Sequence, residues 1–439
     1  MEPRNKKKMK TQKNEEKSNF DRLSCLPDSI LCHILSFLDT KSAIHTSLLS
    51  KRYKFLWTQL QNLDFELSEV PYRSLKSYHV DGFPKPYLKP SVYTFEEFVN
   101  YVLSSREETN LTTFRLSMHH LVEPEFVEAW LDYAADHNVQ HLIIRAIVKR
   151  KHVALPKLLL NSSSLITLHL TNATCYSIEL PKSVLLPNLK VLRLKNFKFC
   201  DENYNGDVFS GCPCLETLVL SKCCIKPGEK LKVIDVNCLK LKNLEIRYWR
   251  SPWCYFDEFM INVNAPELVY FRFQGHLARV NFKKGMPCLD TVHVELCYPS
   301  SCAEVNVSER KQKTSESFIS MLHQLHNVKF LSLSMMTVEV VAANTELALL
   351  PSTFENLRFI KFTTDDKYLE MKIPIMDVRW LLNEDIWILD VPKELLKVLK
   401  IKRKDISPIC LPSNAVHYLL ESSPAAELLC IEIPKLSPD

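Results

Sequence analysis

The residue patterns that usually support catalysis are absent from this sequence. Glycine occurs only six times in 439 residues, and its spacing allows neither a Walker A phosphate loop nor a dinucleotide-binding turn. No Gly-x-Ser-x-Gly elbow and no His-Glu-x-x-His metal motif occurs. The adjacent histidines His119 and His120 are expected in a loop just after a strand, without a ligand role. We therefore expect a chain that is not an enzyme and needs no cofactor.

The fifteen cysteines are the other residues that could do chemistry, as metal ligands or as disulfides. The most crowded stretch holds Cys212, Cys214, Cys223, Cys224 and Cys238, whose spacing matches no zinc pattern. The number of cysteines is odd, and thiols stay reduced in the nucleus and cytoplasm, where we expect this protein (see below). Both points argue against a disulfide framework. Because cysteine is often buried, we expect these thiols to pack in a core and predict no metal site.

Positive charge is concentrated at the N-terminus. The chain has a net charge of +5, of which residues 1–20 contribute +4, from seven Lys or Arg and three Glu. We expect residues 1–20 to be a disordered basic tail; the alternative is a nuclear-localisation signal at Lys6, Lys7, Lys8 and Lys10. The nearly neutral remainder makes nucleic-acid binding the weaker hypothesis.

The distribution of apolar residues along the chain indicates the cellular compartment in which the protein is expected. No run of 18 or more apolar residues occurs that could span a membrane. No apolar segment follows the N-terminal charges, so no secretory signal is expected. We therefore expect a protein of the nucleus, the cytoplasm or both, without membrane contact.

Residues 21–61 are dense in apolar side chains and are patterned as three short helices. Pro27 and Asp28 suit the first turn of the first helix, because proline lacks an amide hydrogen and an acid favours the positive end of the helix dipole. Asp39 or Thr40 is expected to cap the second helix, and Ser50 the third. The first helix carries an apolar stripe at helical spacing, formed by Ile30, Leu31, Ile34, Leu35 and Leu38.

A unit of this size buries little of its own surface, so its stripes need the rest of the chain or a partner. The segment resembles the F-box family at fixed spacings, namely Leu26-Pro27, Ile30, Ile34-Leu35, Phe37-Leu38, Leu48-Leu49-Ser50-Lys51-Arg52 and Leu56-Trp57. Tyr53 departs from the pattern, since plant-type members usually have tryptophan there. The resemblance implies binding to the SKP-family adaptor of SCF-type cullin–RING ubiquitin ligases and, through it, to cullin. The residues that it implies at the adaptor are Leu26, Pro27, Ile30, Ile34, Leu35, Leu49 and Ser50; the alternative is that they form ordinary helix-bundle core.

A pattern of the form Leu-x-x-Leu-x-Leu returns along most of the remaining chain. Its copies begin near Leu60, Leu111, Val139, Leu165, Leu189, Leu215, Leu241, Leu268, Leu289, Val328 and Leu357. The usual spacing lies in the range of leucine-rich repeats, about 20–29 residues. Each copy predicts a short strand whose fourth and sixth positions point into a core. Stacked copies predict a curved parallel sheet with outer helices, an α/β leucine-rich-repeat solenoid.

Two outer helices can be placed from their start signals. Thr94 and Glu97 form a capping box before one, and Pro124 opens another. Residues 68–92 are expected to interrupt the first copies with a loop. Residues 299–317 are polar, and we expect them to be a flexible loop.

Most of the chain, from residue 21 to 364, resembles plant F-box/leucine-rich-repeat proteins. Trp387, Val391-Pro392, Leu395-Leu396 and the segment from Ala415 resemble the FBD region that often follows the repeats in that family, with a shortened middle. The final Leu-Leu-Cys-Ile-Glu-Ile resembles one more repeat strand. The predicted organisation is a basic tail at 1–20, an F-box at 21–61, leucine-rich repeats at 62–364 and an FBD-like region at 365–439.

The outward positions of the strands are the best candidates for recognising a partner. Arg193, Lys195, Arg247 and Arg272, with Tyr270 beside them, could form a basic patch that pairs with a carboxylate or phosphate on a protein substrate; the alternative is a mixed polar surface. We expect substrate recognition within an SCF-type ubiquitin ligase. The alternative is a non-catalytic scaffold that binds the adaptor without promoting ubiquitination.

Overall fold

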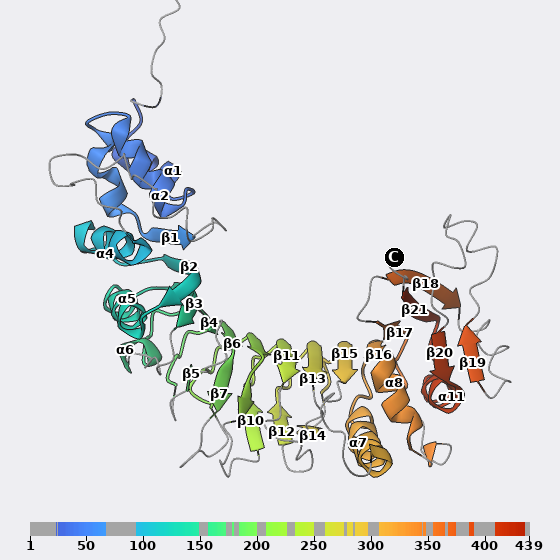
Figure 1. Ribbon diagram of the computed structural model, residues 1–439. Coiled ribbons are helices and arrows are strands. Elements are labelled where there is room, and N and C mark those ends of the chain that lie inside the picture. Colours follow the sequence, from blue (N-terminus) through green and yellow to red (C-terminus); the bar gives the residue numbers. More distant parts are fainter. Residues whose placement is uncertain are drawn as a thin grey trace, which may run out of the picture.

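The computed structural model of the chain describes residues 23, 25–66, 94–148, 157–172, 178–179, 184–199, 208–225, 233–249, 260–275, 279–283, 286–296, 307–344, 346–347, 354–364, 368–374, 386–389 and 409–434. Predictions for the tail at 1–20, for the loop at 68–92 and for the segment around Val391 lie outside these residues. Figure 1 shows the helical N-terminal module at one end of an arc of strands.

The N-terminal module consists of short helices. They are α1 (Asp28–Leu35), α2 (Thr40–His45) and two 3-10 helices, η1 (Thr46–Leu48) and η2 (Tyr53–Gln59). Asp39 caps α2, because its Oδ1 accepts a hydrogen bond from the Ser42 amide at 2.9 Å. The prediction that Ser50 caps the third helix is wrong: η2 has no side-chain cap, and the Ser50 carbonyl instead accepts from the Tyr53 amide.

Most strands join one long sheet that lines the concave side of the arc (Figure 1). In order across the sheet they are β1 (Asn62–Glu66), β2 (Thr113–Val122), β3 (His141–Val148), β4 (Thr167–Asn172), β6 (Val191–Lys195), β8 (Thr217–Ser221), β11 (Asn243–Trp249), β13 (Tyr270–Gly275), β15 (Thr291–Leu296), β16 (Phe330–Ser334), β17 (Phe359–Thr363), β21 (Leu428–Pro434) and β18 (Tyr368–Pro374). All neighbours are parallel except β21 and β18. This arrangement confirms the predicted solenoid, and each predicted copy coincides with a strand. His119 and His120 lie inside β2, and not in a loop after a strand.

Burial alternates along these strands as the repeat predicts. On β6, Leu192 and Leu194 are buried while Arg193 and Lys195 are exposed. The inward residues of successive strands stack into one continuous apolar core that includes the buried side of the N-terminal module. Stacking therefore buries apolar surface that a single repeat would leave exposed.

A tight turn precedes most strands and sets their spacing. In the Leu-Pro-Asn-Leu lead, the Leu189 amide donates to the Leu186 carbonyl at 3.1 Å, and both side chains are buried. The same bond recurs before β8, β11, β13 and β15. Gly211 lies beside one such turn, and its carbonyl accepts from the Leu186 amide at 2.9 Å. This contact holds neighbouring repeats together by their backbones.

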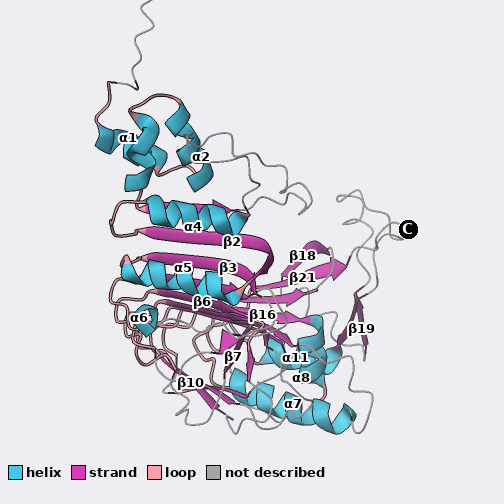
Figure 2. Ribbon diagram, turned by 60° about the vertical axis from the view of Figure 1, so that its left-hand side comes forward, coloured by secondary structure: helices cyan, strands magenta, loops and turns pink. Residues whose placement is uncertain are grey.

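The convex side is covered by helices at both ends of the arc and by short strands between them (Figures 1 and 2). The helices are α4 (Phe95–Ser105), α5 (Pro124–Asp136), α6 (Lys157–Leu160), α7 (Val307–Leu322), α8 (Met335–Ala342) and α11 (Ser413–Glu421). The strands are β5 (Ile178–Glu179), β7 (Phe197–Phe199) and β9 (Cys224–Ile225) in one sheet, and β10 (Val233–Asn237), β12 (Met260–Asn264) and β14 (Arg279–Phe282) in another. The predicted Thr94–Glu97 capping box and the Pro124 helix start are both confirmed.

The prediction of a flexible loop at residues 299–317 is wrong, because α7 begins within it at Val307. Phe318 and Leu322 are buried at the end of α7, and the buried Ser315 hydroxyl donates to the Val341 carbonyl of α8 at 3.3 Å. The polar composition of residues 299–317 therefore does not indicate the helix, which is stabilised by packing of its second half.

The C-terminal strand β21 is one more repeat strand, as predicted. It pairs in parallel with β17, with Ile360 opposite Leu429. On its other side it pairs with the antiparallel β18. A separate two-stranded sheet joins β19 (Ile386–Leu389) to β20 (Ile409–Pro412). The boundary at residue 365 between repeats and an FBD-like region stays a prediction.

Candidate functional site

The helix α1 has one buried and one exposed apolar row. Leu31 and Leu35 are 1% and 3% exposed and belong to the core. Ile30 and Ile34 are 45% and 42% exposed, one turn apart on the same face. The predicted stripe of five residues is therefore split lengthwise: this chain covers Leu31 and Leu35, while Ile30, Ile34 and Leu38 stay exposed.

Further apolar side chains are exposed nearby in the sequence. Eight of the fifteen large apolar side chains exposed among the described residues fall between residues 23 and 55. We call seven of them the F-box apolar face: Ile30, Ile34, Phe37, Leu38, Leu48, Leu49 and Phe55. Exposed apolar surface concentrated in this way is typical of an interaction site.

Six of the seven residues predicted at the adaptor are accessible. Pro27, Ile30, Ile34 and Ser50 are exposed, as is Leu49, and Leu26 is half-buried. Leu35 is the exception and corrects the prediction, because its side chain lies inside the module. Residues i and i+4 share a helix face, so Leu35 follows Leu31 into the core.

One charged residue holds the ends of this module together, and sequence reasoning did not single it out. Arg52 donates to Asp28 Oδ1 from Nε at 2.8 Å and from Nη2 at 2.6 Å. The same Nη2 donates to the Leu26 carbonyl. Arg52 therefore fixes the Leu26-Pro27 segment against the start of η2. Its place at the end of the Leu-Ser-Lys-Arg motif is the signal that could have identified it.

Two buried polar groups join the module to the first repeats. The Thr40 hydroxyl, on α2, accepts from the Asp64 amide of β1 at 2.8 Å. The buried Arg106 donates to the Leu60 carbonyl from Nη2 at 2.8 Å and to the Tyr133 hydroxyl from Nη1 at 2.7 Å. These bonds attach the inner side of the module to the first repeats, and the F-box apolar face remains exposed to solvent.

The strand register aligns the outward residues of the concave face in rows. One row runs from Arg115 on β2 through His169 on β4 and Arg193 on β6 to Arg272 on β13. Arg193 and Lys195 are exposed, and neither forms an ion pair with any residue that the structure describes. No carboxylate in the described part of the chain therefore neutralises these two cations of β6.

The other two predicted cations are neutralised by carboxylates. Arg247 pairs with Glu245 on the same strand. Arg272 Nη2 lies 2.5 Å from Glu295 Oε1 on the neighbouring β15. The structure therefore brings the predicted patch together only in part, because Arg247 and Arg272 belong to ion pairs.

Aromatic rings flank the ion-paired region. His293 lies between Tyr270 and Phe330, with ring centroids 5.4 Å away on each side. Burial raises the pKa of Tyr270. Burial, followed by the charges of Arg272 and Lys361, lowers the pKa of His293 to about 4. At neutral pH this part of the face presents uncharged rings.

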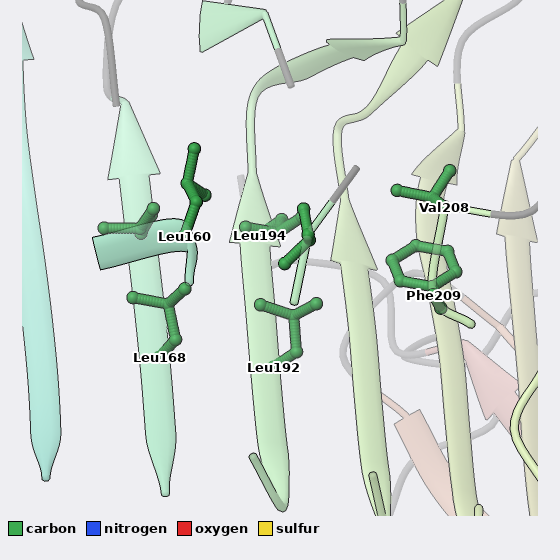
Figure 3. Close-up of a pocket in the computed structure, with 8 residues that line it drawn as sticks. Leu160, Leu168, Leu192, Leu194, Val208 and Phe209 are labelled. Atoms are coloured by element: carbon green, nitrogen blue, oxygen red, sulfur yellow. The ribbon is translucent and has the colours of Figure 1, made fainter. Parts of the chain in front are cut away.

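Among the described residues, no binding site for a small ligand or a metal is seen. Figure 3 shows leucines, Val208 and Phe209 around a small cavity that Val184 also lines. The volume of this cavity is only about 10 Å³, and all its lining residues are apolar. The described residues include no group of three His, Cys, Asp or Glu side chains placed to hold a metal. Cys212, Cys223 and Cys238 are buried, as predicted for core cysteines, and burial raises the pKa of Cys212 to about 11. Within the described segments, no helix combines the length and the apolar character needed to cross a bilayer.

Comparison with known protein families identifies both parts of the chain. The F-box domain model matches residues 23–65. A model described as FBD-associated F-box protein At5g56370, LRR repeats, matches residues 127–351, just over half of the chain.

Relatives with related names come from Arabidopsis thaliana. The putative F-box/LRR-repeat protein At4g15060 is 28% identical over 335 residues, which are 70% of this chain and 72% of the relative. The F-box/FBD/LRR-repeat protein At2g26030 is 24% identical over 367 residues, 82% of this chain and 77% of the relative. The chain therefore belongs to the FBD-associated F-box proteins with leucine-rich repeats.

Proposed function

We propose that this protein is the substrate-recognition subunit of an SCF-type cullin–RING ubiquitin ligase. The observation that carries the proposal is the F-box apolar face: Leu31 and Leu35 are sealed inside while Ile30, Ile34 and Leu49 remain open. A face of this kind fits the SKP-family adaptor that F-box domains bind. Cullin then joins through the adaptor.

The two ends of the molecule have separate tasks in this proposal. The F-box holds the adaptor, and the concave face of the repeats holds a target protein. Ubiquitin transfer is the task of other subunits, and this chain raises the effective concentration of target lysines near the charged enzyme. The site of action is the nucleus, the cytoplasm or both, where SCF ligases work.

The size of the exposed face fits a stable contact. Full burial of an aliphatic side chain stabilises by about 1.5–3 kcal/mol, and these side chains begin roughly half exposed. Three of them then contribute about 3 kcal/mol together, or more than about a hundredfold in affinity.

The experiment is capture of a purified SKP-family adaptor by the full chain. The triple variant Ile30→Ala, Ile34→Ala and Leu49→Ala should lose the adaptor. A matched control, Leu158→Ala, Leu239→Ala and Met336→Ala, removes exposed apolar side chains elsewhere and should keep it. Equal capture by both triple variants would overturn the adaptor site.

Ubiquitination then separates a ligase subunit from a passive scaffold. A captured target whose ubiquitin conjugates depend on the wild-type F-box supports the ligase role. Conjugates unchanged between wild type and the Ile30, Ile34, Leu49 variant would contradict it.

A further inference from the structure

The concave face carries a compact group of cations on three adjacent strands, β3, β4 and β6. Arg145 on β3 is aligned through Thr171 on β4 with Lys195 on β6. In the next row, His169 on β4 is aligned with Arg193 on β6. With strands about 4.8 Å apart and alternate residues about 6.7 Å apart, the three cations surround Thr171 and His169 within about 10 Å. We call Arg145, Arg193 and Lys195 the cationic cluster.

Among the described residues, no carboxylate pairs with a member of the cluster. All three side chains are exposed, and none of them forms an ion pair within the part of the chain that the structure describes. Arg115 on β2 does not belong to the cluster, because it forms an ion pair: its Nη1 lies 3.3 Å from Asp64 Oδ2. Three like charges kept this close repel one another, so the arrangement favours the binding of an anion.

His169 provides a second observation at the same place. Its Nε2 atom is buried and has no hydrogen-bond partner among the described residues. Burial, and then the charges of Arg193, Arg145 and Arg115, lower its pKa to about 4. The ring is therefore neutral at pH 7, mainly because it is buried, and the three arginines around it create a positive field that attracts an anion.

We infer that the cationic cluster binds the phosphoryl group of a phosphorylated segment in the target protein. A carboxylate brings one negative charge, whereas a phosphoryl group brings about −1.5 to −2 and three acceptor oxygens. The two guanidinium forks and the lysine ammonium supply charge-assisted donors for those oxygens, and Thr171 lies between Arg145 and Lys195 in the strand register. This inference rests on the proposed function, because it names the class of target that the concave face selects.

The charges around the cluster favour a peptide over a nucleic acid. Glu66 lies two strands away from Arg145 on one side, and the Glu245–Arg247 ion pair lies two strands away from Arg193 on the other. A nucleic acid carries a phosphate at every nucleotide, so beyond the cluster its phosphates would meet the Glu66 carboxylate on one side and an arginine that already has a partner on the other. A single phosphorylated side chain on an otherwise uncharged segment avoids them.

The test uses the full chain bound to its adaptor and bead-bound peptide libraries. One library has a central phosphoserine between degenerate positions, and two matched libraries have serine or glutamate there. We expect retention on phosphoserine and not on serine or glutamate. The variant Arg145→Gln, Arg193→Gln and Lys195→Gln should lose retention by about tenfold or more.

A charge-matched control variant distinguishes a specific phosphoryl site from nonspecific attraction between the peptide and surface cations. Lys190→Gln, Lys240→Gln and Arg279→Gln remove three exposed cations that lie outside the aligned rows and should leave retention unchanged. Equal loss in both triple variants, equal retention on the glutamate library, or competition by polyuridylate as strong as by phosphopeptide would overturn the inference. Unfolding temperatures of the variants, measured in parallel, identify any that fail to fold, and single Arg193→Gln then replaces the triple change.

Failure of the inference and failure of the proposed function give different results. Loss of phosphoserine retention while adaptor capture persists removes only the phosphoryl site. Loss of adaptor capture removes the proposed function, while the free chain still reports on phosphoserine binding. As a second readout, bound phosphopeptide should raise the pKa of His169, measured by NMR of the labelled ring.

Discussion

Arg52 Nε lies 2.8 Å from Asp28 Oδ1, joining the start of the 3-10 helix η2 to the first residue of α1. The same guanidinium binds the Leu26 carbonyl, so one side chain sets the position of the Leu26-Pro27 opening. The contact spans 24 residues of sequence and orders the edge of the proposed adaptor site. A surface ion pair alone is worth about 0–1 kcal/mol, but this one also satisfies a backbone acceptor.

The first prediction concerns this contact. Arg52→Ala should lower the free energy of unfolding by about 1 kcal/mol and weaken adaptor affinity, because Leu26 and Pro27 lose their anchor. Calorimetric titration with a purified adaptor measures the affinity. The exposed neighbour Lys51→Ala serves as the control and should change neither quantity. Wild-type affinity in Arg52→Ala would show that the contact does not position the site.

The second prediction concerns Gly211. A Cβ atom placed there would lie 1.9 Å from the Val184 carbonyl oxygen, which is backbone and cannot turn away. Gly211→Ala should therefore force two repeats apart and lower the free energy of unfolding by about 1–3 kcal/mol. Chemical denaturation measures it, with the exposed Pro213→Ala as a nearby control. An unchanged denaturation midpoint would show that the turn tolerates a side chain.

The third prediction concerns the link between the last two parallel strands. Lys361 Nζ on β17 lies 2.8 Å from Glu432 Oε1 on β21, and the Glu432 side chain is only 5% exposed. Lys361→Met should destabilise the chain by about 3 kcal/mol, because it leaves a buried carboxylate without its cation. Replacing both residues, with Lys361→Met and Glu432→Leu, should recover most of the loss. A double variant as unstable as the single one would contradict this account.

The fourth prediction concerns acid stability. The pKa of His293 is lowered to about 4 in the folded chain, against about 6.5 for a free histidine. Between these values the unfolded chain binds more protons, so stability is complete above pH 6.5 and falls as the pH drops towards 4. His293→Phe keeps a ring between Tyr270 and Phe330 and removes this proton uptake. Its unfolding temperature should fall less than that of wild type between pH 7 and pH 4.5. If the two proteins lose the same number of degrees over this range, protonation of His293 does not contribute to the acid sensitivity.

Local sequence patterns predict the regular parts of this fold well. The alternation on β6, where Leu192 and Leu194 face in and Arg193 faces out, follows from the two-residue period of a strand. The Thr94 capping box is equally local, because all its partners lie within one helical turn. Such features need no knowledge of the rest of the chain.

Features set by distant residues could not be read in the same way. The apolar stripe of α1 does not show which of its rows packs against η2, so the sequence alone does not reveal that Leu35 is buried inside the module. The basic patch was overestimated because Glu295, the partner of Arg272, comes from a different repeat. The polar first half of α7 gives no helical signal in the sequence, and packing of the second half stabilises this helix in the fold.

Hydrogen–deuterium exchange of the full chain, with and without a purified SKP-family adaptor, shows where the adaptor binds. We expect the adaptor to slow exchange in α1 and in residues 46–50, where the F-box apolar face lies, and to leave the amides of β6 to β17 unchanged. Unchanged exchange in α1 at saturating adaptor, or protection confined to the sheet, would contradict the proposed adaptor site.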